Sequence, residues 1–115
     1  MSQALASKLD AIKEKGGVKS RDVAQLLATT PQTVSRWQTG RTEPQGDQLR
    51  KLLALEWLLG ELAELYAPDE AKLWLFSPHR LLQGDSPATR IQREGIDGID
   101  DVLALVNQMK EGAFA

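Results

Sequence analysis

The spacing of apolar residues predicts helices along the whole chain. Near the N-terminus, Leu5, Leu9 and Ile12 recur at helical intervals and predict an amphipathic helix that ends near Gly16-Gly17. The apolar positions of a last helix, which Gly112 is expected to end, are Ile96, Ile99, Val102, Leu103, Val106 and Met109. Strand-like alternation of apolar and polar residues is nearly absent, so the expected fold class is all-α.

Two short helices are predicted between Ser20 and Gly40 from their end signals. Ser20 is a suitable N-cap for the first of them, and Asp22 would lie in its first turn, where the helix dipole favours an acid. Thr30 is expected to cap the second, with Pro31 at its first helical position, where a missing N–H group costs nothing. Gly40 is the expected C-terminal stop.

A long helix is predicted to begin at Asp47, after a link of residues 42–46 that contains proline and glycine, and to reach about Tyr66. Its apolar residues are Leu49, Leu52, Leu53, Leu55, Trp57, Leu58, Leu59, Leu62 and Leu65. They cover more than one face of a helix, which is more than a small core needs. The pattern predicts a dimer seam on this helix. The alternative is a central helix that its own chain buries on several sides.

Shorter pieces follow Pro68. The pattern predicts a brief helix over 69–76, a turn that starts at Ser77-Pro78, and a helix that starts at Ser86-Pro87 and ends near Gly95. The chain is therefore divided into residues 1–46, residues 47–67 as a connecting helix, and residues 68–115.

The stretch from Ser20 to Gly40 has the spacing of a helix-turn-helix. The residues expected to close the motif on itself are Val23, Ala24, Leu27, Ala28, Val34 and Trp37. Ala24 is small enough for two helices to cross closely, and Val34 would fill the angle between them. The turn Ala28-Thr29-Thr30 lacks the glycine that such turns often carry. This motif indicates a DNA-binding protein and not an enzyme.

Most side chains left outside this motif can meet phosphates or base edges. Gln32 is suited to adenine and Arg36 to guanine, whereas Thr33 could contact a thymine methyl group or a phosphate. The predicted DNA-binding residues are Lys19, Arg21, Thr30, Gln32, Thr33, Ser35, Arg36 and Arg41. Because few of them are basic, DNA binding is expected to need a dimer or a larger assembly. The alternative is a three-helix core that has this spacing without DNA binding.

Charge is distributed unevenly over the 115 residues. The formal net charge is −2, but residues 1–50 carry eight Lys/Arg against five Asp/Glu, and residues 51–115 carry six against eleven. A basic half and an acidic half predict two surfaces with different partners. The acid pairs Glu61/Glu64 and Asp100/Asp101 are interpreted as solvated helix faces.

Composition also narrows the chemistry. The chain has no cysteine, no apolar run long enough to span a membrane, and no signal-peptide pattern, so we expect a cytoplasmic protein without membrane contact. The single histidine, His79, is expected at the surface or at a helix cap. Neither a metal site nor a catalytic triad can be built around it, and no phosphate loop is present, so no metal or other cofactor is expected.

The second half carries a longer motif, Leu73 to Pro87, which reads LWLFSPHRLLQGDSP. Together with Arg93-Glu94-Gly95 and the final helix, it resembles the C-terminal domain of the Xre/MbcA/ParS antitoxins. His79 stands where that family usually has asparagine. The preceding helix-turn-helix resembles the N-terminal, Xre-like half of the same family, and the two parts occur in the expected order.

The resemblance implies a partner. Such antitoxins bind a RES-domain toxin that consumes NAD, and their C-terminal domain covers the toxin's active-site cleft. Their N-terminal half dimerises, and in many members it represses the operon. The residues expected to bind the toxin are Arg80, Arg90, Arg93, Asn107, Lys110, Glu111, Phe114 and Ala115. Phe114 would anchor the tail, whose carboxylate could pair with basic groups that hold NAD phosphates; alternatively, Phe114 folds back on Trp74.

The expected partners are therefore a cognate RES-type toxin, operator DNA, and a second copy of the chain or a larger assembly with the toxin. Two other functions remain open. The chain could be a stand-alone transcriptional repressor whose acidic half dimerises or senses a ligand, or an interaction scaffold that does not bind DNA.

Overall fold

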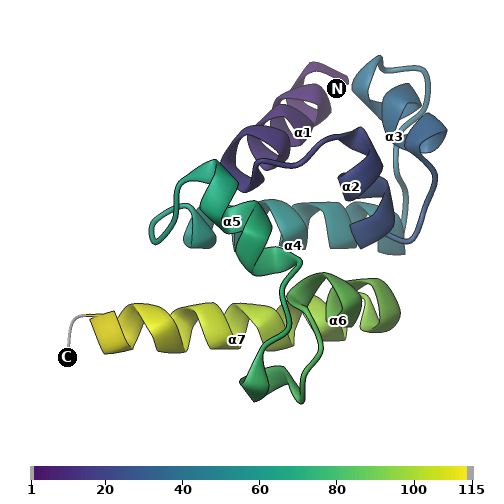
Figure 1. The fold of residues 1–115 in the computed structure, drawn as a ribbon. Coiled ribbons are helices and arrows are strands. Elements are labelled where there is room, and N and C mark those ends of the chain that lie inside the picture. Colours follow the sequence, from purple (N-terminus) through teal and green to yellow (C-terminus); the bar gives the residue numbers. More distant parts are fainter. Residues whose placement is uncertain (1, 114–115) are drawn as a thin grey trace.

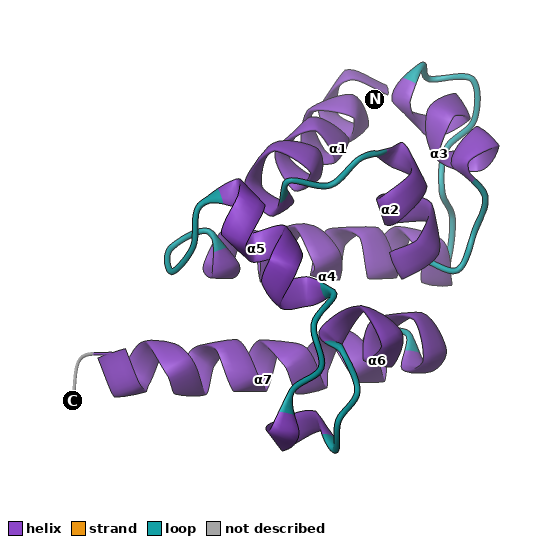
Figure 2. Cartoon of the chain, viewed as in Figure 1, coloured by secondary structure: helices purple, strands orange, loops and turns teal. Residues whose placement is uncertain are grey.

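The computed structural model describes residues 2–113, and they form helices without any strand (Figures 1 and 2). The predicted all-α class is confirmed. The elements are α1 (Ser2–Gly16), α2 (Ser20–Leu26), α3 (Pro31–Gln38), α4 (Asp47–Leu62), α5 (Pro68–Leu75), the 3-10 turn η1 (Arg80–Leu82), α6 (Pro87–Glu94) and α7 (Ile96–Ala113).

Helix α4 lies at the centre of the molecule. The helices α1 to α3 lie on one side of it, and α6 and α7 lie on the other (Figure 1). Its buried leucines are Leu52, Leu55, Leu58, Leu59 and Leu62. They belong to one core that continues from Leu5 in α1 to Val106 in α7. Burial by its own chain therefore accounts for most of the apolar surface of α4, as the alternative interpretation held.

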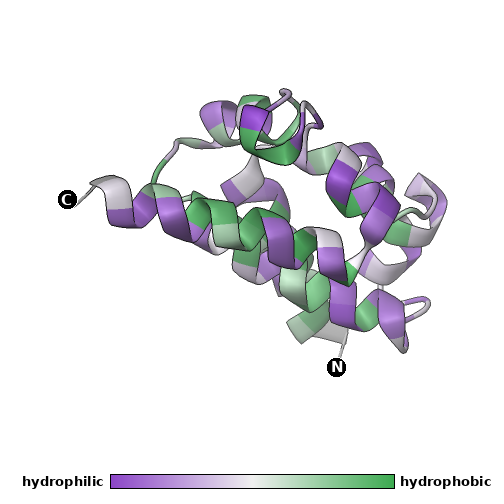
Figure 3. Ribbon diagram, turned by 90° about the horizontal axis from the view of Figure 1, so that it is seen from below, coloured by the Kyte–Doolittle hydropathy of each residue, from purple (hydrophilic) through white to green (hydrophobic). Residues whose placement is uncertain are grey.

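The outer faces of the helices are mixed in character, and several large apolar side chains stay exposed. In Figure 3, which views the molecule from below, apolar and polar positions alternate along α7. The division into residues 1–46, 47–67 and 68–115 stays a prediction about function, because the core passes through all three parts without a break.

Several predicted helix ends are confirmed. The Thr30 hydroxyl accepts a hydrogen bond from the Thr33 N–H (3.1 Å), and the Ser86 hydroxyl accepts one from the Thr89 N–H (3.0 Å). Each cap satisfies a backbone donor that an α-helix leaves free in its first turn. Gly40, with φ of 77°, follows α3 in the left-handed conformation that favours glycine.

Other predicted ends are wrong by one to four residues. Lys19, not Ser20, is the N-cap of α2, because its N–H donates to the Asp22 carboxylate (3.0 Å). Gly46 precedes α4, so Asp47 is its first helical residue and not its cap. At the far end of the chain, Gly112 does not stop α7, which continues to Ala113.

The end of α4 is also earlier than predicted. The helix ends at Leu62, and the chain then turns so that the N–H groups of Leu65 and Tyr66 both donate to the Leu62 carbonyl. Pro68 disfavours helical backbone at the residue before it, and Ala67 is extended with ψ of 161°. The sequence pattern continued because Leu65 and Tyr66 still pack against the core from this turn.

Candidate DNA-binding and protein-binding surfaces

The stretch predicted as a helix-turn-helix contains α2 and α3, which pack against each other. Of the residues expected to close it, Val23, Ala24, Leu27, Val34 and Trp37 are buried. Ala28 is exposed instead, because it occupies the turn with φ of 55°. A left-handed alanine costs roughly 1–2 kcal/mol, which is the penalty that glycine would avoid at this position.

The exposed side of α3 presents polar donors. Gln32, Ser35, Arg36 and Arg41 are exposed and line a shallow hollow of about 310 Å³ together with Thr39. This brings two predicted base-reading residues and one predicted phosphate contact together on one surface.

The remaining predicted DNA-binding residues lie around this surface. The Thr30 hydroxyl caps α3 and lies 2.9 Å from the Thr33 hydroxyl, so both threonines help to fix the start of the helix. Lys19 and Arg21 are exposed at the start of α2. All eight residues stay predictions as DNA contacts.

Helix α4 carries an exposed apolar stripe, which we define as Leu49, Leu53 and Trp57. These residues follow one another at intervals of four, so they lie along one face of the helix. The side chain of Trp57 is 62% exposed and that of Leu53 is 40% exposed. Tryptophan is seldom left this open in the absence of a partner, because its burial removes a large apolar area from water.

Arg90 is largely enclosed by the turn around η1. Its side chain is only 12% exposed and pairs with Asp85 (3.4 Å) and Asp101 (3.3 Å). It also donates to the Leu82 carbonyl (2.9 Å) and to the Gln83 side-chain oxygen (2.7 Å). Arg90 therefore holds η1 against α6 and α7, and its predicted role in toxin contact stays a prediction.

Arg93 supports the same turn from outside. Its guanidinium donates to Asp85 (2.7 Å) and to Glu94 (3.0 Å). The hydrogen bond from Arg93 lowers the pKa of the Asp85 carboxyl, and the same bond raises the pKa of Arg93. About half of the Arg93 side chain stays exposed, so a contact with a partner stays a prediction.

Lys110 joins α7 to α4. Its ammonium lies 3.0 Å from a Glu61 carboxylate oxygen and 3.2 Å from a Glu64 carboxylate oxygen, and its side chain is 21% exposed. The hydrogen bond from Lys110 lowers the pKa of Glu61, and the same bond raises the pKa of Lys110. Glu61 is therefore not merely solvated, whereas Glu64 stays 59% exposed as expected, and Lys110 contributes to the fold.

The other predicted toxin-binding residues divide into two groups. Arg80, Asn107 and Glu111 are exposed and available to a partner. Phe114 and Ala115 lie outside the described residues, as does any contact between Phe114 and Trp74.

His79 precedes η1 as its N-cap, which agrees with a capping position. It is not free at the surface, because its ring packs on Trp74 with ring centres 4.7 Å apart. Its Nε2 lies 3.0 Å from the Trp74 carbonyl oxygen. His79 therefore fixes the segment between α5 and η1.

Sequence reasoning missed two exposed leucines of the second half, Leu73 on α5 and Leu81 on η1. Leu81 lines a hollow of about 330 Å³ between η1 and α7. Two adjacent leucines at 81 and 82 cannot both enter the core from one tight turn, and this was the available signal.

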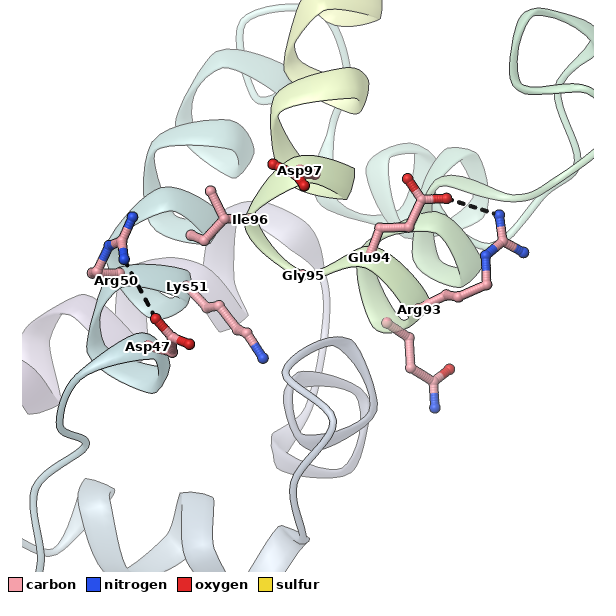
Figure 4. Close-up of a pocket in the computed structure, with 9 residues that line it drawn as sticks. Asp47, Arg50, Lys51, Arg93, Glu94, Gly95, Ile96 and Asp97 are labelled. Atoms are coloured by element: carbon pink, nitrogen blue, oxygen red, sulfur yellow. Dashed lines mark hydrogen bonds and ion pairs between the residues drawn. The ribbon is translucent and has the colours of Figure 1, made fainter.

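A polar hollow of about 420 Å³ lies between the start of α4 and the turn that joins α6 to α7 (Figure 4). Asp47 pairs with Arg50 (3.4 Å) on one wall, and Arg93 pairs with Glu94 on the other. Three cations and three carboxylates line the hollow, so their charges balance and it offers no concentrated charge for a ligand.

A bilayer-spanning element is also absent from the described helices, none of which combines the necessary length and apolarity.

The chain is similar to known proteins over nearly its whole length. Residues 54–112 match the family model for the antitoxin Xre/MbcA/ParS C-terminal toxin-binding domain. Mycobacterial cidal antitoxin MbcA from Mycobacterium bovis is 35% identical over 111 residues, which is 96% of this chain and 95% of that protein; MbcA from Mycobacterium tuberculosis gives the same values. The crystal structure of the M. tuberculosis MbcT–MbcA toxin–antitoxin complex contains a chain that superposes with a TM-score of 0.80 at 33% identity, covering 96% of this chain and 97% of that one.

Proposed function

Because this chain belongs to the Xre/MbcA/ParS antitoxin family, we propose that it is an antitoxin that binds and neutralises a cognate protein toxin. The observation that carries the proposal is the match of residues 54–112 to a toxin-binding domain. The likeness to MbcA at both ends of the chain supports it. We expect no catalytic activity of its own, and we place its action in the cytoplasm.

We propose further that the toxin is of the RES type, consumes NAD, and is blocked when this chain covers its active-site cleft. Helix α7 is suited to this task because Lys110 fixes it to α4 through Glu61 and Glu64. A helix held in this way can present Asn107 and Glu111 without first becoming ordered, which lowers the entropic cost of binding.

Co-expression with the product of the neighbouring gene tests the antitoxin function. We expect a stable complex that survives purification and that stops the loss of NAD caused by the free toxin. The proposal fails if no complex forms and NAD loss continues at the same rate. If a complex forms but NAD loss continues, the blocking of the cleft is contradicted, whereas the binding of the toxin is not.

The second proposed activity is repression of its own operon through α2 and α3. The exposed donors Gln32, Arg36 and Arg41 on one surface favour it. Two copies of the chain would present two such surfaces to adjacent DNA half-sites. A stand-alone repressor is the competing function, and it would bind this DNA without forming any complex with a toxin.

A gel shift with upstream promoter DNA at low salt measures this activity. We expect Arg36→Ala to weaken binding by about 1–3 kcal/mol, the usual cost of one lost base contact. Lys8→Ala is the control, since Lys8 pairs with Glu56 on the α1–α4 side. If wild type and Arg36→Ala both ignore the promoter, with and without toxin, the chain is an interaction scaffold that does not bind DNA.

We propose that the homodimer forms through the apolar stripe of α4. Gly60 supports this, because a Cβ atom there would have only the Lys15 ammonium nearby, at 3.8 Å. Glycine inside a helix costs about 1 kcal/mol relative to alanine, and the packing of this chain does not require it. A residue without a side chain beside Leu53 and Trp57 would let a second helix approach closely.

A further inference from the structure

Leu81 occupies a turn whose shape is fixed by charged groups. Its side chain is 65% exposed, whereas that of the adjacent Leu82 is buried. Arg90 donates to the Leu82 carbonyl and to the Gln83 side-chain oxygen, and it is held in turn by Asp85 and Asp101. An exposed leucine on so constrained a turn loses little conformational freedom when it is buried by a partner.

The hollow beside Leu81 has an apolar part, to which Leu81, Leu82, Ala104 and Leu105 contribute. It has a volume of about 330 Å³, and α7 forms its floor through Ala104 and Leu105. Ala104 is exposed although apolar, and its small side chain leaves the floor open. Gln83 and Gln108 form part of the rim.

The rim of this hollow does not need a charged group from a binding partner. Arg90 and Asp101 pair with each other at 3.3 Å, so their charges are already balanced. The Gln83 oxygen accepts from Arg90 at 2.7 Å, which leaves its amide N–H groups able to donate to a carbonyl of a bound chain. The fitting occupant is therefore an apolar side chain with a backbone carbonyl beside it.

We propose that this groove, defined by Leu81, Gln83, Ala104 and Gln108, receives an apolar side chain of the toxin, and that Leu81 packs against the toxin in return. The inference rests on the proposed antitoxin function. The whole groove lies inside the matched toxin-binding range 54–112, and its α7 face continues one turn further to Glu111. The groove would hold the body of the toxin while the end of α7 reaches its cleft.

The other exposed leucine of this half does not offer the same site. Leu73 is 71% exposed, but one of the two hollows beside it includes Asp22 and Gln25 of α2, which lie outside the matched range. Leu73 has no part in the face of α7 that leads to the tail. It therefore provides a matched control of the same residue type and similar exposure.

Titration of the toxin encoded by the neighbouring gene against purified variants tests the proposal, with calorimetry as the readout. We expect Leu81→Asp to weaken the affinity about tenfold or more, as the loss of a packed anchor does. Ala104→Trp, which fills the hollow, should weaken it to a similar degree. Leu73→Asp should change it by less than about twofold, within the range of surface substitutions.

The melting temperature and solution mass of each free variant separate this effect from misfolding or altered self-association. If wild type binds and Leu81→Asp binds equally well, the groove is not the toxin site. Equal weakening of toxin affinity by Leu81→Asp and Leu73→Asp also overturns the proposed groove. A change in the solution mass of the free Leu81→Asp variant that accounts for its lost affinity overturns it as well. If wild type itself forms no complex, the proposed antitoxin function fails before the groove is tested.

Discussion

Single residues in this protein acquire roles from neighbours that the sequence places far away. Arg80, Arg90 and Arg93 looked equivalent in the sequence, as cations near the toxin-binding end. The structure leaves Arg80 exposed, half-covers Arg93 and encloses Arg90 among three carboxylates and a carbonyl. The pattern along the chain could not separate them, because the distinction depends on the packing of η1 on α6 and α7.

Removal of the Arg90 side chain should destabilise the fold. Arg90→Ala removes the donor to Asp101 and one of two donors to the Leu82 carbonyl and to Asp85. Because these are several charge-assisted bonds at a largely enclosed site, we expect the free energy of unfolding to fall by about 2 kcal/mol. Arg80→Ala should change it by less than about 0.5 kcal/mol because that residue is exposed. Urea denaturation measures both; equal midpoints would show that the Arg90 contacts contribute nothing.

At the scale of elements, the sequence predicted each described helix but not each end. Caps with their own local hydrogen bond, Thr30 and Ser86, were predicted correctly. The end of α4 was not, because Leu65 and Tyr66 keep the apolar pattern while the chain already turns toward Pro68. Periodicity reports which residues meet the core, and a turn can deliver them to it as well as a helix.

The ion pair between α7 and α4 should make their packing sensitive to acid. The pKa of Glu61 is lowered in the folded state, so its contribution to stability is full above the pKa of the unfolded chain, about 4.3, and is lost as pH falls through the folded pKa. The raised pKa of Lys110 has the opposite sign, and its contribution is lost only as pH rises through the folded value, above 10.5.

Glu61→Gln should therefore unfold at a lower temperature than wild type at pH 7, and the two melting temperatures should converge near pH 2.5. Exposed Glu111→Gln serves as the control and should follow wild type at both values. Thermal melts monitored by circular dichroism provide the measurement. A Glu61→Gln difference that persists unchanged in acid would assign the effect to packing and not to the charge.

At the scale of the whole molecule, α4 both holds the core and exposes a stripe. Burial by its own chain accounts for Leu52, Leu55, Leu58, Leu59 and Leu62, whereas Leu49, Leu53 and Trp57 stay open, and a dimer seam on that face stays a prediction. Helical spacing alone showed only that α4 carries more apolar residues than a small core needs. Only the positions of α1 and α7 decide which leucines remain outside.

If the stripe is a dimer seam, Trp57→Glu should convert a dimer into a monomer. A charge at the centre of an apolar contact must lose its hydration when the contact forms, and this disfavours association. Light scattering after size-exclusion chromatography measures the mass, with Leu73→Glu as the control at another exposed leucine. A wild type that is monomeric at the highest soluble concentration contradicts the seam.

The candidate surfaces were predicted unevenly. The polar donors of α3 were predicted from one short sequence motif, and the structure brings Gln32, Arg36 and Arg41 together on one surface. The groove beside Leu81 joins η1 to α7 across more than twenty residues, and no local spacing could indicate it. Surfaces built within one helix pair are visible in a sequence, whereas those shared by distant elements are not.

The continuous core also bears on how long each activity can last in a cell. A protease that cut the link between α4 and α5 would separate α7 from Leu58, Leu59 and Leu62, and both fragments would expose apolar surface that ordinarily marks a chain for degradation. If the proposed DNA binding and the proposed toxin binding both hold, they would then end together after a single cleavage. The two proposed activities would share one half-life, so a cell that clears this chain would release the toxin and the promoter at the same moment.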